Sequence, residues 1–192
     1  MPRAGLSAHA VIDLAVELVD AEGWSALTLA AVAGRAGVAV PSLYKHVGSL
    51  AELRSAVALV AVRELTRVSA AATVGRSGED ALRALGHAIR GFAHQHPGLY
   101  AAGQVAPDPD GEGGLELAQA AADAVALMSS VLRGFGLPDD RAVDAIRTAR
   151  SAVHGFVMLE AGGGFGMPDS VDQSFEALLD TVVAGVREMA RA

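Results

Sequence analysis

The side chains that could bind a partner gather in one short stretch near the N-terminus. Hydroxyl, phenol, ammonium and imidazole groups in this stretch can bond phosphate oxygens or base edges, and a valine and a proline can touch a thymine methyl group. A threonine that begins a helix offers the positive end of that helix to a phosphate. The pattern predicts a DNA-binding surface made by Thr28, Val40, Pro41, Ser42, Tyr44, Lys45 and His46.

Other candidates for chemistry fail on geometry. His87 and His94 lie on one predicted helix, separated by a rise of about 10.5 Å, which is too far for two ligands of one ion. They share a polar stripe with Arg83 and Arg90 that we expect to be solvated. The glycine-rich Gly162–Gly166 lacks the lysine and spacing of a phosphate-binding loop, and no serine stands in a nucleophile-elbow pattern. We therefore expect no metal site, no cofactor and no enzymatic activity.

Two short predicted helices joined by a tight turn position the DNA-binding candidates. Thr28 begins a helix that runs to about Arg35, Gly37 supplies a left-handed turn, and a further helix covers residues 39–46. Ala33 is small where the two helices cross. The wedge between them is filled by Val32, Val38 and Leu43. This spacing predicts a helix-turn-helix whose second helix enters the major groove. On spacing alone, an ordinary α-hairpin with a solvated Tyr-Lys-His remains open.

Residues 6–67 resemble the DNA-binding domain of the TetR family of transcriptional regulators. The family signature runs from a helix that begins with threonine, through Ala-x3-Gly, to Leu-Tyr-x-His or Leu-Tyr-x-Tyr, and this chain matches it from Thr28 to His46. The resemblance implies phosphate contacts by Thr28, Tyr44, Lys45 and His46, and base contacts by Val40, Pro41 and Ser42. Leu50 departs from the family, where a lysine is usual, so we expect the salt dependence of DNA binding to be shallower by about one unit of slope.

The segment Ala152–Phe156 resembles the C-terminal domain of TetR-type regulators that is named for Trp-His-Gly, with Val153 in place of the tryptophan. The resemblance implies a small-molecule pocket enclosed by the C-terminal helices, and a four-helix dimer interface formed by the last two helices and their mates. We expect the pocket to be lined by Phe92, Tyr100, Met128, Leu132, Phe156 and Met158. Few ionisable residues occupy inward-facing positions, which favours a largely apolar effector. Any of these side chains could instead be ordinary core.

The final predicted helix, residues 171–191, has a wide apolar face. One stripe is widened by Leu179 and Val183, which gives more apolar arc than one internal contact requires. We therefore expect a partner helix to cover it, with burial inside its own domain as the alternative. The predicted dimer interface comprises Val153, Val157, Phe175, Leu178, Val182 and Val186.

The bulk composition favours a cytoplasmic protein. The absence of cysteine excludes disulfides and thiolate metal sites and suits a reducing compartment. No signal-peptide pattern is present, and no apolar run reaches the length expected of a membrane span, so we expect no membrane partner. The net charge is -7, but residues 1–67 carry equal numbers of acidic and basic side chains. The excess acid therefore lies in the C-terminal part, away from the predicted DNA-binding surface.

We expect an all-α protein of about nine helices. Residues 1–50 form a three-helix DNA-binding domain, residues 51–192 form a ligand-binding and dimerisation domain, and a linking helix at residues 49–68 is shared. The predicted function is that of a repressor that binds a palindromic operator as a homodimer and is released by a small, largely apolar effector. The alternative is a helical ligand-binding or protein-interaction module without DNA binding, which Leu50 and the modest basic charge keep open.

Overall fold

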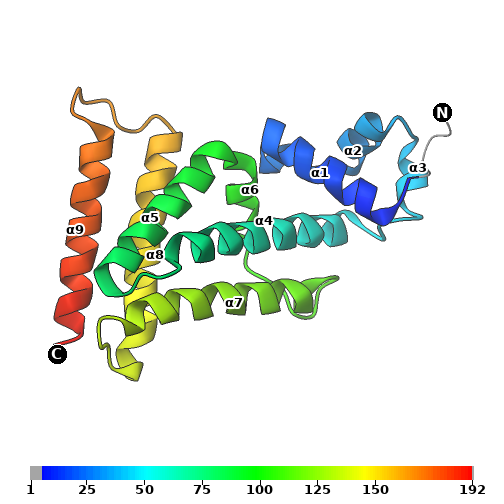
Figure 1. The fold of residues 1–192 in the computed structure, drawn as a ribbon. Helices are drawn as coiled ribbons and strands as arrows, with labels where there is room; N and C mark the ends of the chain where they lie inside the picture. The colour runs from blue at the N-terminus through cyan, green and yellow to red at the C-terminus, as the bar shows by residue number, and fades with distance from the viewer. Residues whose placement is uncertain (1–5, 192) are drawn as a thin grey trace. The chain divides into compact units, whose positions relative to one another are not determined.

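A computed structural model describes residues 6–191, and the regular structure within this range is entirely helical (Figure 1). The all-α prediction with about nine helices is confirmed. The α-helices are α1 (Ala8–Glu22), α2 (Leu29–Ala36), α3 (Val40–Leu43), α4 (Leu50–Thr73), α5 (Gly78–Gln95), α6 (Pro97–Ala102), α7 (Gly114–Arg133), α8 (Ala142–Ala161) and α9 (Val171–Met189). Single 3-10 turns occur at Trp24–Ala26 and Asp139–Arg141.

Two predicted helices are shorter than expected. The recognition helix was predicted to reach His46, but α3 ends at Leu43, and hydrogen-bonded turns follow it, with His46 N donating to Leu43 O at 2.8 Å. Tyr44, Lys45 and His46 therefore lie on a turn between two helices. The sequence predicts a helix over residues 138–160, but a 3-10 turn comes first, and α8 starts at Ala142.

The chain divides into two compact units. One comprises residues up to Leu65 together with His96–Ala122, and the other comprises Thr66–Gln95 together with residues from Asp123 onwards. This division by packing places α6 and the start of α7 with the N-terminal helices. The division predicted at residue 50 concerns function, and it stays a prediction.

In the first unit, α1 packs against α2 and α6. α6 approaches α1 so closely that a Cβ atom on residue 98 would lie 1.8 Å from the carbonyl oxygen of Val19, so only Gly98 fits there. Beside this contact, Nδ1 of His96 lies 2.7 Å from Oδ2 of Asp20. The buried face of α1 consists of Val11, Ala15, Leu18 and Val19.

The second unit has its own hydrophobic core, to which α5, the end of α7, α8 and α9 contribute. Burial of these side chains removes apolar surface from water and supplies the main stabilisation of the unit. Its fully or largely buried members are Ala81, Leu82, Leu85, Val131, Leu132, Ala145, Ala149, Val182, Val183 and Val186.

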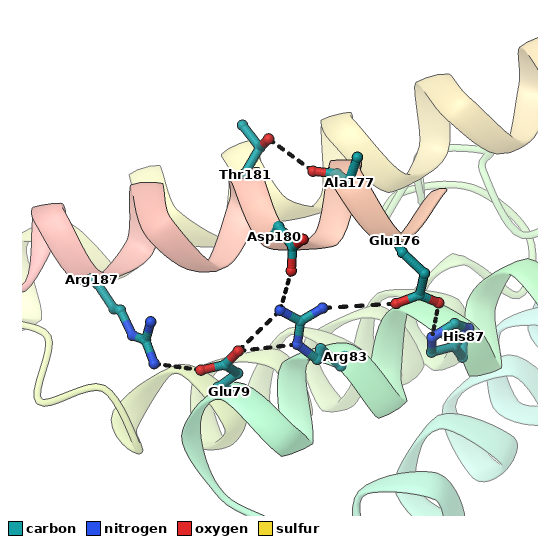
Figure 2. Close-up of polar contacts among 8 residues, drawn as sticks. All are labelled: Glu79, Arg83, His87, Glu176, Ala177, Asp180, Thr181 and Arg187. Carbon is teal, nitrogen blue, oxygen red and sulfur yellow. Dashed lines mark hydrogen bonds and ion pairs between the residues drawn. The ribbon is translucent and has the colours of Figure 1, made fainter. Parts of the chain in front are cut away.

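The polar stripe of α5 was predicted to be solvated. It forms instead a row of ion pairs with α9, which we call the ionic seam (Figure 2). Arg83 bonds Glu79 at 3.0 Å and also Asp180, and His87 lies 3.0 Å from Glu176. Farther along α5, Arg90 pairs with Glu160 of α8 and Asp172 of α9. The sequence could not reveal this arrangement because the acidic partners on α8 and α9 lie 66 or more positions away.

By length and composition, α7 could cross a membrane. Its mean hydropathy reaches 1.3 over an 18-residue window, and 22% of that window is buried. This finding differs from the expectation that no apolar run is long enough, because alanines raise the hydropathy of the helix. A single helix of this kind is weak evidence for a membrane span.

Candidate nucleic-acid interface

The turn between α2 and α3 has the geometry that the sequence predicts. Thr28 caps α2, accepting a hydrogen bond from Ala31 N at 3.1 Å. Gly37 adopts φ 67° and ψ 32°, the left-handed conformation that glycine enters without a Cβ penalty. Val38 N then donates to Ala33 O at 3.1 Å, which satisfies a carbonyl at the end of α2. These contacts fix the direction in which α3 leaves the turn.

Packing beneath α3 decides which of its side chains face solvent. Leu43 is fully buried, as are Val32 and most of Ala33. Tyr44 is 55% exposed directly after Leu43, and Lys45 is exposed beside it. The side chains that are exposed or half-buried include all seven predicted DNA-binding residues, Thr28, Val40, Pro41, Ser42, Tyr44, Lys45 and His46. Tyr44 and Lys45 therefore face solvent, as both a DNA-binding helix-turn-helix and an ordinary α-hairpin with a solvated Tyr-Lys-His require.

The two arginines nearest to this surface already have partners within the chain. Arg35 bonds Glu22 at 2.7 Å, which neutralises its charge locally. Arg54 lies 5.9 Å from the centroid of the Trp24 ring and donates to a backbone carbonyl. Lys45 contributes an exposed positive charge to the predicted surface.

Two carboxylates that are not among the predicted DNA contacts lie at the start of α4, Glu52 on the helix itself and Glu112 from the α6–α7 loop. Ser49 and Glu52 have the Ser-x-x-Glu spacing of a capping box. Ser49 Oγ accepts from Glu52 N at 3.0 Å, and Glu52 Oε2 accepts from Gly48 N at 2.5 Å. Ser49 Oγ also donates to Glu112, a residue of the α6–α7 loop. Glu112 stands 63 positions after Ser49, so no local spacing signals this contact. Leu50 is half-buried and offers no charge.

The predicted effector residues are spread over both units. Tyr100 belongs to the first unit, whereas the other five belong to the second. Within the second unit, Leu132 and Met128 pack in the hydrophobic core, and Met158 is 46% exposed. A shallow hollow between the end of α8 and α9 is lined by Gly164, Phe165, Gly166, Met167, Asp169, Val171 and Ser174 and includes none of the six. The effector site of Phe92, Tyr100, Met128, Leu132, Phe156 and Met158 stays a prediction.

The apolar stripe that predicted the dimer interface is covered within the protomer. Its members pack against α5 and α8, and only Leu178 is half-buried. The argument that this stripe needs a partner helix therefore does not hold, because the chain's own helices supply the cover. The buried members are Val153, Val157, Phe175, Val182 and Val186.

Comparisons with known proteins identify both parts of the chain. A family model described as bacterial regulatory proteins, tetR family, matches residues 11–57, and one described as a tetracyclin repressor-like C-terminal domain matches residues 82–182. An HTH-type transcriptional regulator of Mycobacterium tuberculosis is 37% identical over 160 residues, which are 83% of this chain and 72% of that protein. The HTH-type transcriptional regulator YobS of Bacillus subtilis is 29% identical over 187 residues, 96% of this chain and 95% of that protein.

Solved structures share the fold. The crystal structure of a TetR variant from Acinetobacter baumannii AYE in complex with minocycline is 23% identical in sequence, with a TM-score of 0.70. The match covers 97% of this chain and 99% of that chain. At this level of identity, the likeness establishes the arrangement of helices.

Proposed function

Because the chain belongs to the TetR family of bacterial regulatory proteins, it is a helix-turn-helix transcriptional regulator, and we propose that it represses transcription from a palindromic operator until a small effector releases it. The observation that carries this proposal is the exposure of Tyr44 and Lys45 immediately after the buried Leu43. That arrangement turns the residues able to bond DNA outward while the packing beneath them holds the turn in place.

The recognition element divides into base-reading and phosphate-holding residues. Val40, Pro41 and Ser42 lie on α3, the helix that enters the major groove, where apolar groups meet thymine methyls and a hydroxyl bonds base edges. Tyr44, Lys45 and His46 follow on the turn and bond phosphates on the strand that flanks the groove. Thr28, at the start of α2, holds a phosphate on the other side of the recognition helix.

A homodimer supplies the second half-site contact, and the exposed face of α9 supports a closely packed interface. On this face Ala177, Thr181 and Ala184 are exposed at helical spacing. The Thr181 hydroxyl donates to Ala177 O at 2.8 Å, so it brings no unsatisfied polar group into an interface (Figure 2). On α8, the corresponding face carries Ser151 and Gly155. Small side chains let the helices of two protomers approach closely.

The effector acts by favouring a dimer in which the two recognition helices have the wrong separation for the operator. To do so, the effector must bind the dimer released from DNA more tightly than the dimer that fits the operator. A hundredfold preference, about 2.7 kcal/mol per dimer, weakens operator binding by the same factor. We propose a largely apolar effector bound in the C-terminal domain by residues including Phe92, Met128 and Phe156, which are apolar side chains on α5, α7 and α8.

The proposal is tested by comparing the DNA affinity of the Tyr44→Ala variant with that of the unmodified protein. The probe is duplex DNA from the intergenic region upstream of the protein's own gene, and the measurement is a gel shift at low and high salt. Loss of one phosphate contact and its aromatic packing should weaken binding about tenfold, a cost of about 1.4 kcal/mol. Because Tyr44 is exposed, the melting temperature should not change.

The matched control is Val74→Ala, at an exposed residue of the second unit, and this substitution should leave DNA affinity unchanged. Equal affinities of the Tyr44→Ala variant and the unmodified protein would contradict the assigned surface. Failure of the unmodified protein to bind any duplex at low salt would favour the alternative, a ligand-binding module without DNA binding.

A further inference from the structure

The α6–α7 loop brings an acidic side chain onto the segment that is proposed to face DNA. Glu112 accepts a hydrogen bond from Ser49 Oγ. Its other carboxylate oxygen and Oε2 of Glu52 both lie within 4 Å of the point that a Cβ atom on residue 48 would occupy. Two carboxylates therefore meet at a segment whose proposed partner is a polyanion.

Glu112 is presented by a folded turn. Asp108 organises this turn, because its side chain accepts from Asp110 N at 3.2 Å and its carbonyl accepts from Gly111 N at 3.0 Å. The turn lies against α4, where a Cβ atom on Gly113 would lie 3.4 Å from Cβ of Ser55. The position of Glu112 thus follows from backbone contacts as well as from its own hydrogen bond.

The contact lies within reach of the DNA backbone. Ser49 follows His46 by three residues, which span at most about 11 Å, or the rise of about three nucleotides along one strand. A phosphate oxygen and the Glu112 carboxylate accept hydrogen bonds from the same kind of donor, so they compete for the Ser49 hydroxyl. Glu52 differs, because it is bonded to the backbone of its own helix start and stays there.

We propose that Glu112 is an autoinhibitory residue whose contact with Ser49 must break when the operator binds. This inference rests on the proposed DNA-binding function. The docked carboxylate withholds the Ser49 hydroxyl and adds a negative charge beside the phosphates, and its release removes both obstacles. Operator affinity then depends on the conformation of the α6–α7 loop.

Three substitutions distinguish the effect of the Glu112–Ser49 hydrogen bond on DNA affinity from the effect of the negative charge of the loop. Glu112→Gln removes the charge, Glu112→Asp keeps the charge but shortens the reach to Ser49, and Asp110→Asn removes an exposed charge from the same loop. A contact that is formed about four-fifths of the time lowers affinity about fivefold per protomer. Glu112→Gln leaves the Ser49 hydroxyl only a neutral and therefore weaker acceptor. Glu112→Gln and Glu112→Asp should therefore both bind the upstream intergenic duplex about fivefold more tightly per protomer, whereas Asp110→Asn should change binding less than about twofold, because Glu112 and not Asp110 is the partner of Ser49 and the Asp110 charge is screened.

Fluorescence anisotropy at one fixed low salt concentration gives the four dissociation constants, and hydrogen exchange of residues 108–114 with and without the duplex reports whether the loop is released. Tighter binding by both Glu112 variants, with faster exchange in the loop when DNA is added, supports the inference. It is overturned if Glu112→Asp binds like the unmodified protein, or if Asp110→Asn gains as much as Glu112→Gln. Unmodified protein that binds no DNA would overturn the proposed function, whereas normal binding with four equal constants would overturn this inference alone.

Discussion

At Gly37 a single backbone conformation determines where α3 begins. The residue has φ 67°, and a Cβ atom added there would meet no other atom within 4 Å. The cost of a side chain is therefore purely conformational, about 1 kcal/mol for a left-handed residue with a Cβ atom. At Gly98 the opposite holds, since the conformation is ordinary and the space is absent.

We expect Gly37→Ala to lower the free energy of unfolding by about 1 kcal/mol and to weaken DNA binding, because the strained turn shifts α3. Urea denaturation measures the first effect and a gel shift the second. Gly34→Ala is the matched control. Gly34 lies inside α2 with open space around it, so alanine there should stabilise the protein by about 0.5–1 kcal/mol. A stable Gly37→Ala variant with unchanged DNA binding would show that the left-handed turn does not position α3.

At the scale of the helices, the sequence predicted those whose signals are local. Thr28 caps a helix as predicted, and Ser7 and Ser170 cap α1 and α9 in the same local way, because capping depends on residues three positions apart. The end of α3 was harder to predict, since the turns after Leu43 continue the helical hydrogen bonding without regular helix geometry. The exposure of the seven candidate DNA-binding residues could also be predicted, because Leu43 had to face inward.

Contacts between distant helices could not be predicted in this way. The charges on α5 were placed on one stripe correctly, but their partners on α8 and α9 depend on the tertiary arrangement. Glu112 at Ser49 is a further case of the same kind. The wide apolar face of α9 had two possible covers, a partner or the chain itself, and helical periodicity alone does not distinguish them.

The junction of α5, α8 and α9 should make stability depend on pH. Arg90 donates to Glu160 at 2.5 and 2.9 Å, and these hydrogen bonds, aided by His94, lower the pKa of the Glu160 carboxyl below its usual value. A lowered folded-state pKa means that the stabilisation is complete above the ordinary carboxyl pKa and is lost as the pH falls through the folded value. The loss of folding stability at acidic pH should therefore include a contribution from protonation of Glu160 at this junction.

We expect Glu160→Gln to cost about 2 kcal/mol at pH 7, since Arg90 loses its ionic partner inside a packed junction. The difference from the unmodified protein should shrink as the pH falls below the ordinary carboxyl pKa towards the lowered folded-state value, where Glu160 itself becomes protonated. Urea denaturation across this range measures it, with Glu188→Gln as a control on the exposed end of α9. A difference that stays constant with pH would contradict the role assigned to the ionised carboxylate.

For the whole molecule, the proposed palindromic operator requires two copies of the chain, and the structure narrows where they can meet. The core-facing side of α9 is covered by its own unit, and a second side carries Glu176, Asp180 and Arg187 in the seam with α5. The remaining side exposes the small residues Ala177 and Ala184. A second copy that packs on this side buries surface without disturbing either the core or the ion pairs.

Ala184→Glu should therefore separate the dimer while leaving the protomer folded. A carboxylate buried at a helix–helix contact without a partner costs about 3 kcal/mol, which raises the dimer dissociation constant about a hundredfold. Operator affinity should fall with it, because each monomer then holds only one half-site. Ala71→Glu, an equally exposed alanine on α4, serves as the control and should remain dimeric. Sedimentation equilibrium and circular dichroism measure assembly and folding, and an Ala184→Glu variant that remains a tight, operator-binding dimer would place the interface on another face.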